Sequence, residues 1–353
     1  MESLKINNTP VRTSRNYNAN NIKIENFSFP KTFKKFEDIS IIIPNEKNVL
    51  ENDFDIDKNI TYGLGEEFNN LIENSLNYKL KITINNKRNN NTYLTFNLSK
   101  NKNLVSYIEI NTVKGARGTI FIRFEGEDDK YFVYSRIKAN IEEKSNIKVV
   151  VLNFLNDKSS FFSEYDSNVK ESAKFDFNIA ELGAKYSISN YYSNLSGDFA
   201  KNYLNTIYIG KSKDLTDINY IIHENGKSSE AYITVEGALK DEAVKHFKGT
   251  IDFKRGCKKA IGSEKEFCTL LSDKARSLSL PMLLCTEEDV EGSHSSASGK
   301  IGEKELFYIL SRGFNEKDAK KLLVRARFNK IIENISNEKY KMDIIKRIDE
   351  VLD

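Results

Sequence analysis

Short runs in which apolar and polar residues alternate dominate the chain from about residue 60 to about residue 285. Examples are Tyr78–Ile84 (YKLKITI), 118–124 (GTIFIRF) and 174–179 (KFDFNI), and Asn, Gly, Asp or Lys punctuates such runs. Successive side chains of a β-strand point to opposite faces, so this period of two predicts strands with one buried face. No apolar stretch of helix length separates most of the runs. The pattern therefore constrains the chain to a mainly β fold.

Many short strands at even spacing fit a sandwich, a barrel or a β-solenoid. Three features favour the solenoid, although no fixed repeat period is visible. The array runs for roughly 220 residues without a change in character, and Asn-Gly hairpin signals such as Asn225-Gly226 are few. The chain also ends in helices, which could cover an exposed terminal rung and block pairing along its edge.

Helical periodicity replaces the alternation after Gly299. A first helix is expected over 303–312, with Gly313 behind it where a left-handed C-cap favours glycine. Asn315 is the expected N-cap of a second helix that runs to about Ile332, and a third helix is expected over 337–352. The apolar stripe predicted for the second helix consists of Ala319, Leu322, Leu323, Ala326 and Ile331.

These patterns divide the chain into three parts. Residues 1–45 are expected to form an irregular N-terminal arm, with Pro10, Pro30 and a short amphipathic stretch over 31–36. Residues 46–290 form the β-helix core, and residues 291–353 form a C-terminal helical domain.

Charge and composition exclude several classes of partner. The 353 residues include 54 basic and 51 acidic side chains, and a net charge of +3 gives no global field for nucleic acid or an anionic membrane. No segment approaches the roughly 20 apolar residues that cross a bilayer, and the N-terminus lacks the apolar core of a signal peptide. Three cysteines in a chain of this size fit a reducing compartment better than a disulfide framework. We therefore expect a cytoplasmic protein with no nucleic-acid and no membrane partner.

Residues 270–326 resemble the C-terminal signature of the SufB and SufD family of iron–sulfur cluster assembly scaffolds. The motifs that carry the resemblance are Ser272-Asp273-Lys274-Ala275, Pro281, Asp289-Val290 leading to Ser293-His294, Gly302, Leu306-Phe307-Tyr308 and Ser311-Arg312-Gly313. Residues 174–210, the Phe247-Lys248-Gly249 turn and the opening Asn8-Thr9-Pro10-Val11-Arg12-Thr13 are also similar to the family, the opening to SufD in particular.

The resemblance implies a right-handed parallel β-helix with flanking helical regions, working in a SufBCD-type complex rather than as an enzyme. A SufB-like subunit would pair with it side by side. A SufC-like ABC ATPase would dock on the C-terminal helices, for which the candidate residues are Leu306, Phe307, Tyr308, Arg312 and Gly313. ATPase dimerisation would then twist the two β-helices and open a buried site for iron and sulfur. The chain has no phosphate-binding loop of the Gly-rich Lys-Ser/Thr type, which agrees with nucleotide binding by the ATPase.

Three family positions favour a SufD-like rather than a SufB-like member. The SufB cysteine position falls on Glu266, the SufB glutamate position on Ser295 and the SufD-type cysteine position on Gly292. His294 alone remains of these site residues. We expect no cofactor bound stably by this chain alone, and a nascent iron–sulfur cluster at a subunit interface.

His294 is the first candidate, as an interfacial metal ligand that completes a cluster site begun by a partner's thiolate. The alternative is a histidine hydrogen-bonded in the turn that starts the helical domain. Cys268 and Glu266 share one face of the expected strand, and either could face the partner near His294. For Cys268 the favoured alternative is a small core residue.

Two other functions stay open at this level. The chain could be a self-pairing, SufB-like scaffold that holds the nascent cluster itself. It could instead be a β-solenoid that binds polysaccharide, against which stand the absence of Trp and of a signal peptide. If the first interpretation holds, deletion from about residue 300 should abolish ATPase docking and leave the β-helix folded.

Overall fold

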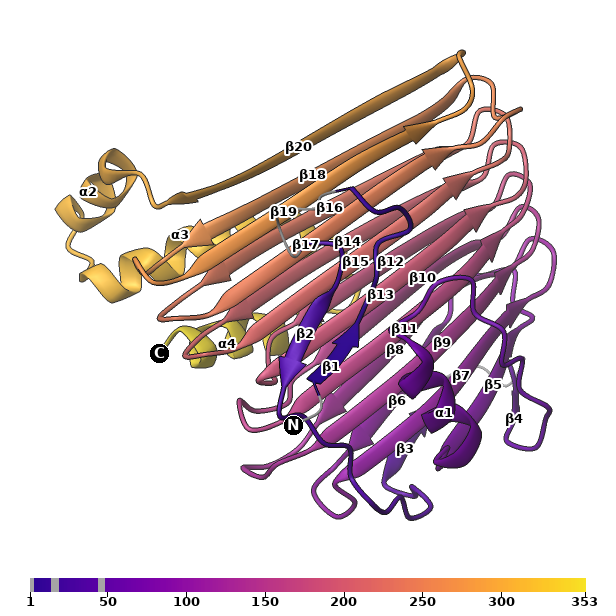
Figure 1. Cartoon of the computed structure of the whole chain (residues 1–353), viewed down its shortest axis with the longest axis horizontal. Coiled ribbons are helices and arrows are strands. Elements are labelled where there is room, and N and C mark those ends of the chain that lie inside the picture. The colour runs from indigo at the N-terminus through magenta and orange to yellow at the C-terminus, as the bar shows by residue number, and fades with distance from the viewer. Residues whose placement is uncertain (1–2, 14–18, 44–47) are drawn as a thin grey trace.

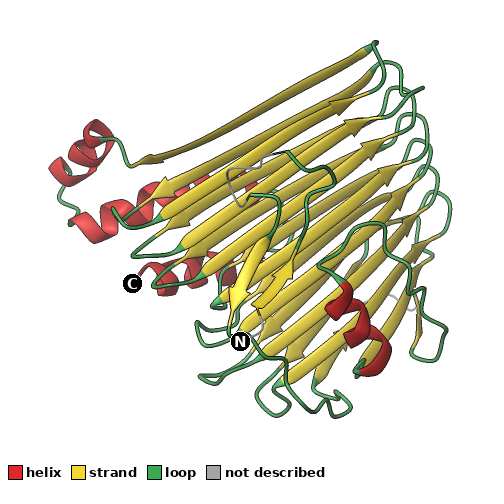
Figure 2. Ribbon diagram, viewed as in Figure 1, coloured by secondary structure: helices red, strands yellow, loops and turns green. Residues whose placement is uncertain are grey.

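The strands form a β-solenoid of about eight turns, seen in a computed structural model that describes residues 3–13, 19–43 and 48–353 (Figure 1). Within these residues, two nine-stranded sheets make up most of the fold, and four helices lie at its margins (Figure 2). The predicted mainly β solenoid is therefore confirmed. Of the expected arm and core, residues 1–2, 14–18 and 44–47 lie outside the described residues.

The first sheet, here called the β20 sheet, contains in spatial order β20 (Val290–Lys300), β18 (Ala260–Leu270), β16 (Glu230–Leu239), β14 (Lys201–Gly210), β12 (Lys174–Glu181), β10 (Asn146–Asn153), β8 (Arg117–Glu125), β6 (Asn91–Asn97) and β3 (Ile39–Ile42). The second, the β19 sheet, contains β19 (Arg276–Cys285), β17 (Val244–Phe253), β15 (Leu215–Glu224), β13 (Tyr186–Leu195), β11 (Ser160–Val169), β9 (Phe132–Ile141), β7 (Asn103–Thr112), β5 (Tyr78–Ile84) and β4 (Val49–Glu51). From β5 and β6 onward all neighbours pair in parallel, whereas β3 and β4 pair antiparallel at the N-terminal end.

Coil length varies, which explains why no fixed period is visible in the sequence. In-register partners are 27 residues apart between Phe175 and Asn202 and 30 residues apart between Glu266 and Ser296. The turns between the strands account for this difference in coil length. Non-glycine residues with positive φ recur in them, for example Lys144, Ser172 and Ser228, at φ values of 58°, 55° and 52°.

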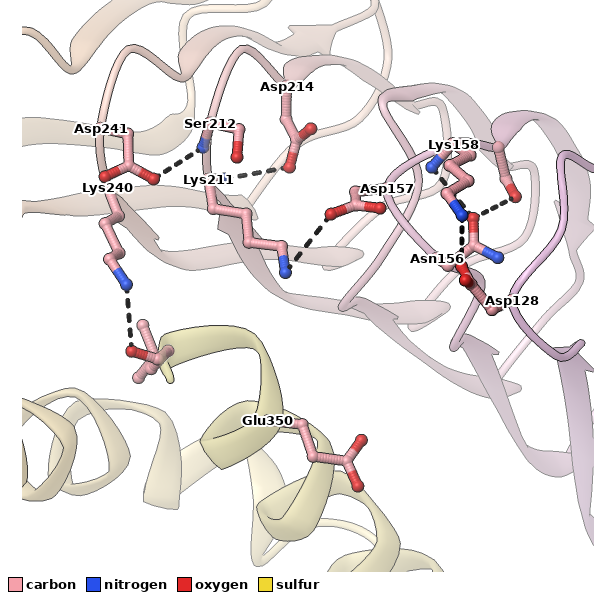
Figure 3. Close-up of polar contacts among 12 residues, drawn as sticks. Asp128, Asn156, Asp157, Lys158, Lys211, Ser212, Asp214, Lys240, Asp241 and Glu350 are labelled. Atoms are coloured by element: carbon pink, nitrogen blue, oxygen red, sulfur yellow. Dashed lines mark hydrogen bonds and ion pairs between the residues drawn. The ribbon is translucent and has the colours of Figure 1, made fainter.

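Charged side chains link successive turns along one edge of the solenoid (Figure 3). The Ser212 backbone N–H donates to Asp241 Oδ2 at 2.9 Å, and the Lys211 ammonium lies 3.6 Å from Asp157. Beside this edge, Lys240 Nζ donates to the backbone oxygen of Leu352 at 3.3 Å. The ladder therefore also ties the last helix to the coils.

Alternate residues of each strand fill the space between the sheets with a continuous apolar core. One column of in-register residues shows the packing, running through Ile120, Val149, Phe177, Leu204 and Ile233 on β8 to β16. All five side chains are at most 1% exposed. This burial follows from the period-two pattern of the sequence.

The N-terminal arm is more ordered than expected. β1 (Ser3–Ile6) and β2 (Ile22–Glu25) form an antiparallel hairpin, and α1 (Glu66–Asn74), which the sequence analysis missed, lies near it on the outer face of the β19 sheet. Buried Asn7 joins the arm to the sheet by donating to the Ser189 oxygen at 3.0 Å. The stretch over 31–36 forms no helix or strand.

The three C-terminal helices are α2 (Glu303–Ser311), α3 (Glu316–Ile332) and α4 (Glu338–Leu352), close to their expected ranges. Both predicted caps are confirmed: Gly313 has φ 93°, and the Asn315 side chain accepts from the Asp318 N–H at 2.9 Å. The stripe expected on α3 is partly wrong. Leu322 is exposed, whereas Val324 and Phe328 are buried, because α3 packs on the solenoid as well as on α4.

Where the helices pack also differs from expectation. Instead of covering the terminal rung, α3 and α4 lie along the outer face of the β20 sheet, where they bury Ile207, Ile209 and Ala238. These side chains point outward, so the sheet's outer face is apolar and binds the helices more favourably than the end of the solenoid. The strands continue to Lys300, ten residues past the expected boundary at 290, and His294 lies within β20.

Candidate functional site

The last coil leaves the C-terminal end of the solenoid open. β19 and β20 are the edges of the two sheets, with no further strand beyond them in the part of the chain that the structure describes. Residues 291–298 of β20 are exposed throughout. Because neither strand is covered, side chains that would be internal in an earlier coil are open to solvent here.

His294 lies on β20 and not in a turn, so the alternative of a turn histidine is wrong. It is exposed, and it makes no hydrogen bond or ion pair to another described residue. Its Cα is in register with that of Glu264 on β18, and parallel partners in register share a face. Since Glu264 is buried inside the solenoid, His294 lies on the lumen face of the open coil.

The lumen changes character as it approaches this end. The column that begins with Ile120 and Val149 is apolar as far as Ile233, and then continues through Glu264 to His294. The adjacent column changes from Val235 to Glu266. Polar side chains therefore replace apolar ones at the end of these two columns.

Glu266 forms a buried ion pair with Lys245. The Lys245 ammonium lies 2.7 Å from Glu266 Oε1, and neither charged side chain is solvent-exposed. Glu266 Oε2 accepts from Ser279 at 2.9 Å and from Ser296, on the open strand, at 2.7 Å. Glu266 thus has a full set of partners within this chain, and its carboxylate does not reach the surface.

Glu264 has no such partners. The side chain is 1% exposed, and both carboxyl oxygens lack a hydrogen-bond donor among the described residues. Burial, with a smaller contribution from the Glu266 charge, raises the pKa of Glu264 to about 8. The carboxyl group lies against Gly249 on β17, where an added Cβ would come within 2.2 Å of Oε1. The missing side chain at Gly249 makes the space that this carboxyl group occupies.

Cys268 is fully buried, which confirms the favoured core assignment. It shares the lumen face with Glu266, as the period of two predicts, but neither side chain faces outward toward a partner. Burial raises the pKa of the Cys268 thiol, so the reactive thiolate is disfavoured. Cys257 is also buried, and Cys285 is the exposed cysteine.

The metal-binding capacity of the lone chain is limited. Among the described residues, no group of three or more His, Cys, Asp or Glu side chains is placed to hold a metal ion. His294 and Glu264 are two residues of these types that occupy consecutive positions of one column at the open end.

A second surface lies on α2, which stands beside the end of β20 and away from the coils (Figure 1). Phe307 is 73% exposed and Tyr308 is 56% exposed, and within this fully described helix no residue is buried. The Arg312 guanidinium lies over the Tyr308 ring and donates to its hydroxyl at 3.2 Å. We call Phe307, Tyr308, Leu310 and Arg312 the α2 face.

Leu306 turns toward the solenoid instead. It lines a groove of about 310 Å³ together with Leu270 and Leu271, next to the α2 face. Leu306, a docking candidate, is therefore half-buried beside the solenoid, whereas Leu310 is exposed.

Comparison with known proteins identifies the family. A family model described as the SufBD core domain of the SUF system for FeS cluster assembly matches residues 95–327, which is most of the solenoid and part of the helical region. The chain belongs to the SufBD family.

Individual relatives of this SufBD family chain include two proteins named SufD. The SufD protein of Bacillus subtilis is 27% identical over 177 residues, which cover 50% of this chain and 40% of the relative. The SufD protein of Escherichia coli is 24% identical over 243 residues, covering 68% of this chain and 57% of the relative. A SufBD family protein of Pyrococcus horikoshii is 27% identical over 233 residues, or 65% and 50% of the two chains. The chain spans about half the length of the curated relatives that it matches.

No helix among the described residues is long and apolar enough to cross a membrane.

Sequence reasoning found His294 but missed Glu264 and Lys245. A signal for Glu264 was present, because it alternates with Glu266 and Cys268 and so shares their strand face. Three polar or ionisable residues at that spacing in a buried strand indicate an unusual interior. Lys245 had no comparable signal, since its partner lies 21 residues away on the other sheet.

Proposed function

We propose that this SufBD family chain is a SufD-like scaffold subunit, not itself an enzyme, which pairs with a SufB-like subunit through its open terminal coil. The observation that carries the proposal is the uncovered β20 strand. Its backbone edge is unpaired within the described chain, and an edge of this kind readily accepts a strand from another protein.

The composition of β20 supports strand pairing. Natural edge strands are usually protected by charges, proline or bulges. Between Gly292 and Gly299 the strand instead contains Ser293, His294 and then small residues, with no Lys, Arg, Asp, Glu or Pro. On the neighbouring edge, Pro281 removes a backbone donor from β19. The open coil therefore offers β20 as the better pairing edge.

The α2 face is the proposed docking surface for a SufC-like ATPase. Large exposed aromatic side chains with a neighbouring arginine have the composition of interface hot spots. Truncation at about residue 300 is a poor test of this docking surface, because it would also remove α3 and α4. Ile207, Ile209 and the other apolar side chains that these helices cover would then be exposed. Substitutions on α2 leave those side chains covered.

In this proposal, the nascent cluster is cargo that forms between subunits and is not held stably by this chain alone. His294 contributes the imidazole ligand, and the partner contributes the thiolates. The burial of Cys268 and Cys257 supports this division, since these two thiols are withdrawn from the interface.

Co-expression with SufB-like and SufC-like subunits, followed by affinity purification, tests the proposal. Both partners should be retained. Ser298→Pro should remove an outward-facing backbone donor from β20 and release the SufB-like subunit, whereas Ser298→Ala should retain it. His294→Ala should leave the complex intact and lower the yield of cluster.

Purification of the chain as a homodimer that acquires visible absorption on anaerobic reconstitution would favour the self-pairing scaffold instead. If the SufB-like subunit does not co-purify with this chain, with or without the SufC-like subunit, the proposed role is refuted.

A further inference from the structure

Glu264 is a carboxyl group in the solenoid interior, and both of its oxygens lack a hydrogen-bond partner among the described residues. Glu264 continues a column in which Ile120, Val149, Phe177, Leu204 and Ile233 are all buried and apolar. An isoleucine there would extend the core. A buried carboxyl group without a hydrogen-bond partner costs free energy instead, and such a group in a native protein usually has a functional reason.

The buried cation of this region, Lys245, is paired with other groups and not with Glu264. Lys245 Nζ donates to Glu266 Oε1 at 2.7 Å and to Ser279 Oγ at 2.9 Å, and it lies 3.3 Å from the Leu278 oxygen. Those contacts account for its three N–H donors. The Glu266 carboxylate likewise has three partners of its own. Glu264 is thus left without a partner, although Lys245 and Glu266 in the same part of the interior are fully paired.

The residue that follows Glu264 in the column is His294. Neighbouring strands in a sheet are about 4.8 Å apart, so the His294 Cα lies one strand spacing beyond the Glu264 Cα. The two side chains share the lumen face. Gly249 on the opposite wall leaves the space that the carboxyl group occupies, since no Cβ fills that position.

We propose that Glu264 is a second cation ligand, and that Glu264 with His294 forms a two-residue half-site for a divalent transition-metal ion such as ferrous iron. This inference rests on the proposed function in assigning a ligand role to His294. A carboxylate oxygen and an imidazole nitrogen are both suitable ligands for ferrous, manganous and cobaltous ions. Water or a partner's side chains fill the remaining coordination positions.

The half-site lies at the mouth of the lumen, with the carboxylate inside and the imidazole at the edge. It would deliver this chain's metal ligands to the same end of the solenoid that exposes β20. An ion bound there would also satisfy the buried carboxyl group, which has no donor among the residues that the structure describes. The arrangement therefore explains both the unpaired carboxyl group and its alignment with His294.

The experiment uses histidine NMR of the full chain, which contains three histidines, His223, His246 and His294. Anaerobic titration with Co²⁺, a paramagnetic substitute for ferrous iron, to about 1 mM should shift or broaden the His294 signal saturably and leave the other two unchanged. Glu264→Gln should weaken this binding at least about tenfold. Glu181→Gln is the matched control, since Glu181 is another buried lumen carboxyl group, bonded to Asn153 and Ser187.

Two results would overturn the inference. One is a His294 signal that Co²⁺ leaves unchanged, and the other is an equal affinity in the wild type and Glu264→Gln. Thermal unfolding supplies the second measurement: Glu264→Gln should keep or raise the unfolding midpoint, because it removes no hydrogen bond. A strongly lowered midpoint would assign Glu264 a structural role instead. The proposed function fails separately, if the partner subunits do not co-purify while Co²⁺ still binds.

Discussion

Glu264 and His294 occupy consecutive positions in one column of the solenoid lumen, the first fully buried and the second exposed at the open end. The five preceding positions of this column, from Ile120 to Ile233, are apolar and stabilise the solenoid by burial. The last two coils instead contain an unpaired carboxyl group, a buried ion pair and a thiol. Along this column, the apolar side chains and the ionisable ones therefore occupy different coils of the same fold.

The three cysteines should differ sharply in reactivity. Cys285 is exposed, whereas Cys257 and Cys268 are buried, and burial raises the pKa of Cys257 to about 11. Alkylation of the native protein, followed by mass spectrometry, should therefore modify Cys285 alone. All three should react after unfolding. Rapid modification of Cys268 in the native protein would contradict its place in the core.

Gly237 should be required for the packing of Tyr208. A Cβ at Gly237 would lie 1.9 Å from the ring of Tyr208, which is fully buried. Gly237→Ala should lower the free energy of unfolding by about 1–3 kcal/mol, measured by urea denaturation. In a Tyr208→Leu background, which lacks the clashing ring atoms, the same substitution should cost less. Equal costs in both backgrounds would show that the clash is not the cause.

Stability should fall as pH rises, in part through Glu224. Burial raises the pKa of this carboxyl group to about 8, so the folded state holds its proton more tightly than the unfolded state. Its contribution is fully present below pH 4.5 and is lost as pH rises through about 8. Glu224→Gln should therefore flatten the decline in unfolding free energy over this window by a few kcal/mol, at about 1.4 kcal/mol per pKa unit.

The control for this measurement is Glu288→Gln, which changes an exposed carboxylate in a turn. It should leave the pH dependence as in the wild type. Part of the slope should remain in Glu224→Gln, because burial also raises the pKa of Asp214 to about 7. An unchanged slope in Glu224→Gln would refute the assignment.

Removing one member of the Lys245–Glu266 ion pair should lower the free energy of unfolding more than replacing both members by apolar residues. Lys245→Met leaves a buried carboxylate without its cation and should destabilise the chain by about 3–5 kcal/mol. The double variant Lys245→Met/Glu266→Leu should recover most of that loss, since neither charge remains. Urea denaturation of the single and double variants measures the coupling. As a control, the exposed pair of Glu316 and Lys320 on α3 should contribute no more than about 0.5 kcal/mol.

The α2 face should affect binding without affecting folding. Phe307→Ser removes a side chain that is 73% exposed, so the unfolding midpoint should stay close to that of the wild type. Affinity for a SufC-like ATPase, measured by titration calorimetry, should fall by about 30-fold or more if Phe307 is a hot spot of about 2 kcal/mol. Met342→Ser on α4, also exposed, is the matched control. Equal binding by Phe307→Ser and the wild type would place the docking surface elsewhere.

Local signals in the sequence were enough to determine the elements of this protein. The period of two in runs such as Tyr78–Ile84 fixed the strands and their buried faces, because side-chain direction depends only on the backbone of the same strand. The caps at Gly313 and Asn315 were predictable for the same reason, since a cap involves residues within one helical turn. His294 came from the resemblance of the sequence around it to a known family.

Only the tertiary structure determined which residues from different coils are neighbours. The partner of Glu264 in its column is 30 residues further along the chain, and coils of unequal length hide that register from the sequence. The packing of α3 on the β20 sheet likewise set which side of the helix is buried, and so exposed Leu322 and buried Phe328. Burial and hydrogen-bond satisfaction depend on neighbours from distant coils. For that reason the sequence alone does not show that the Glu264 carboxyl group is buried, unpaired and next to His294 in its column. The inferred half-site rests on that placement.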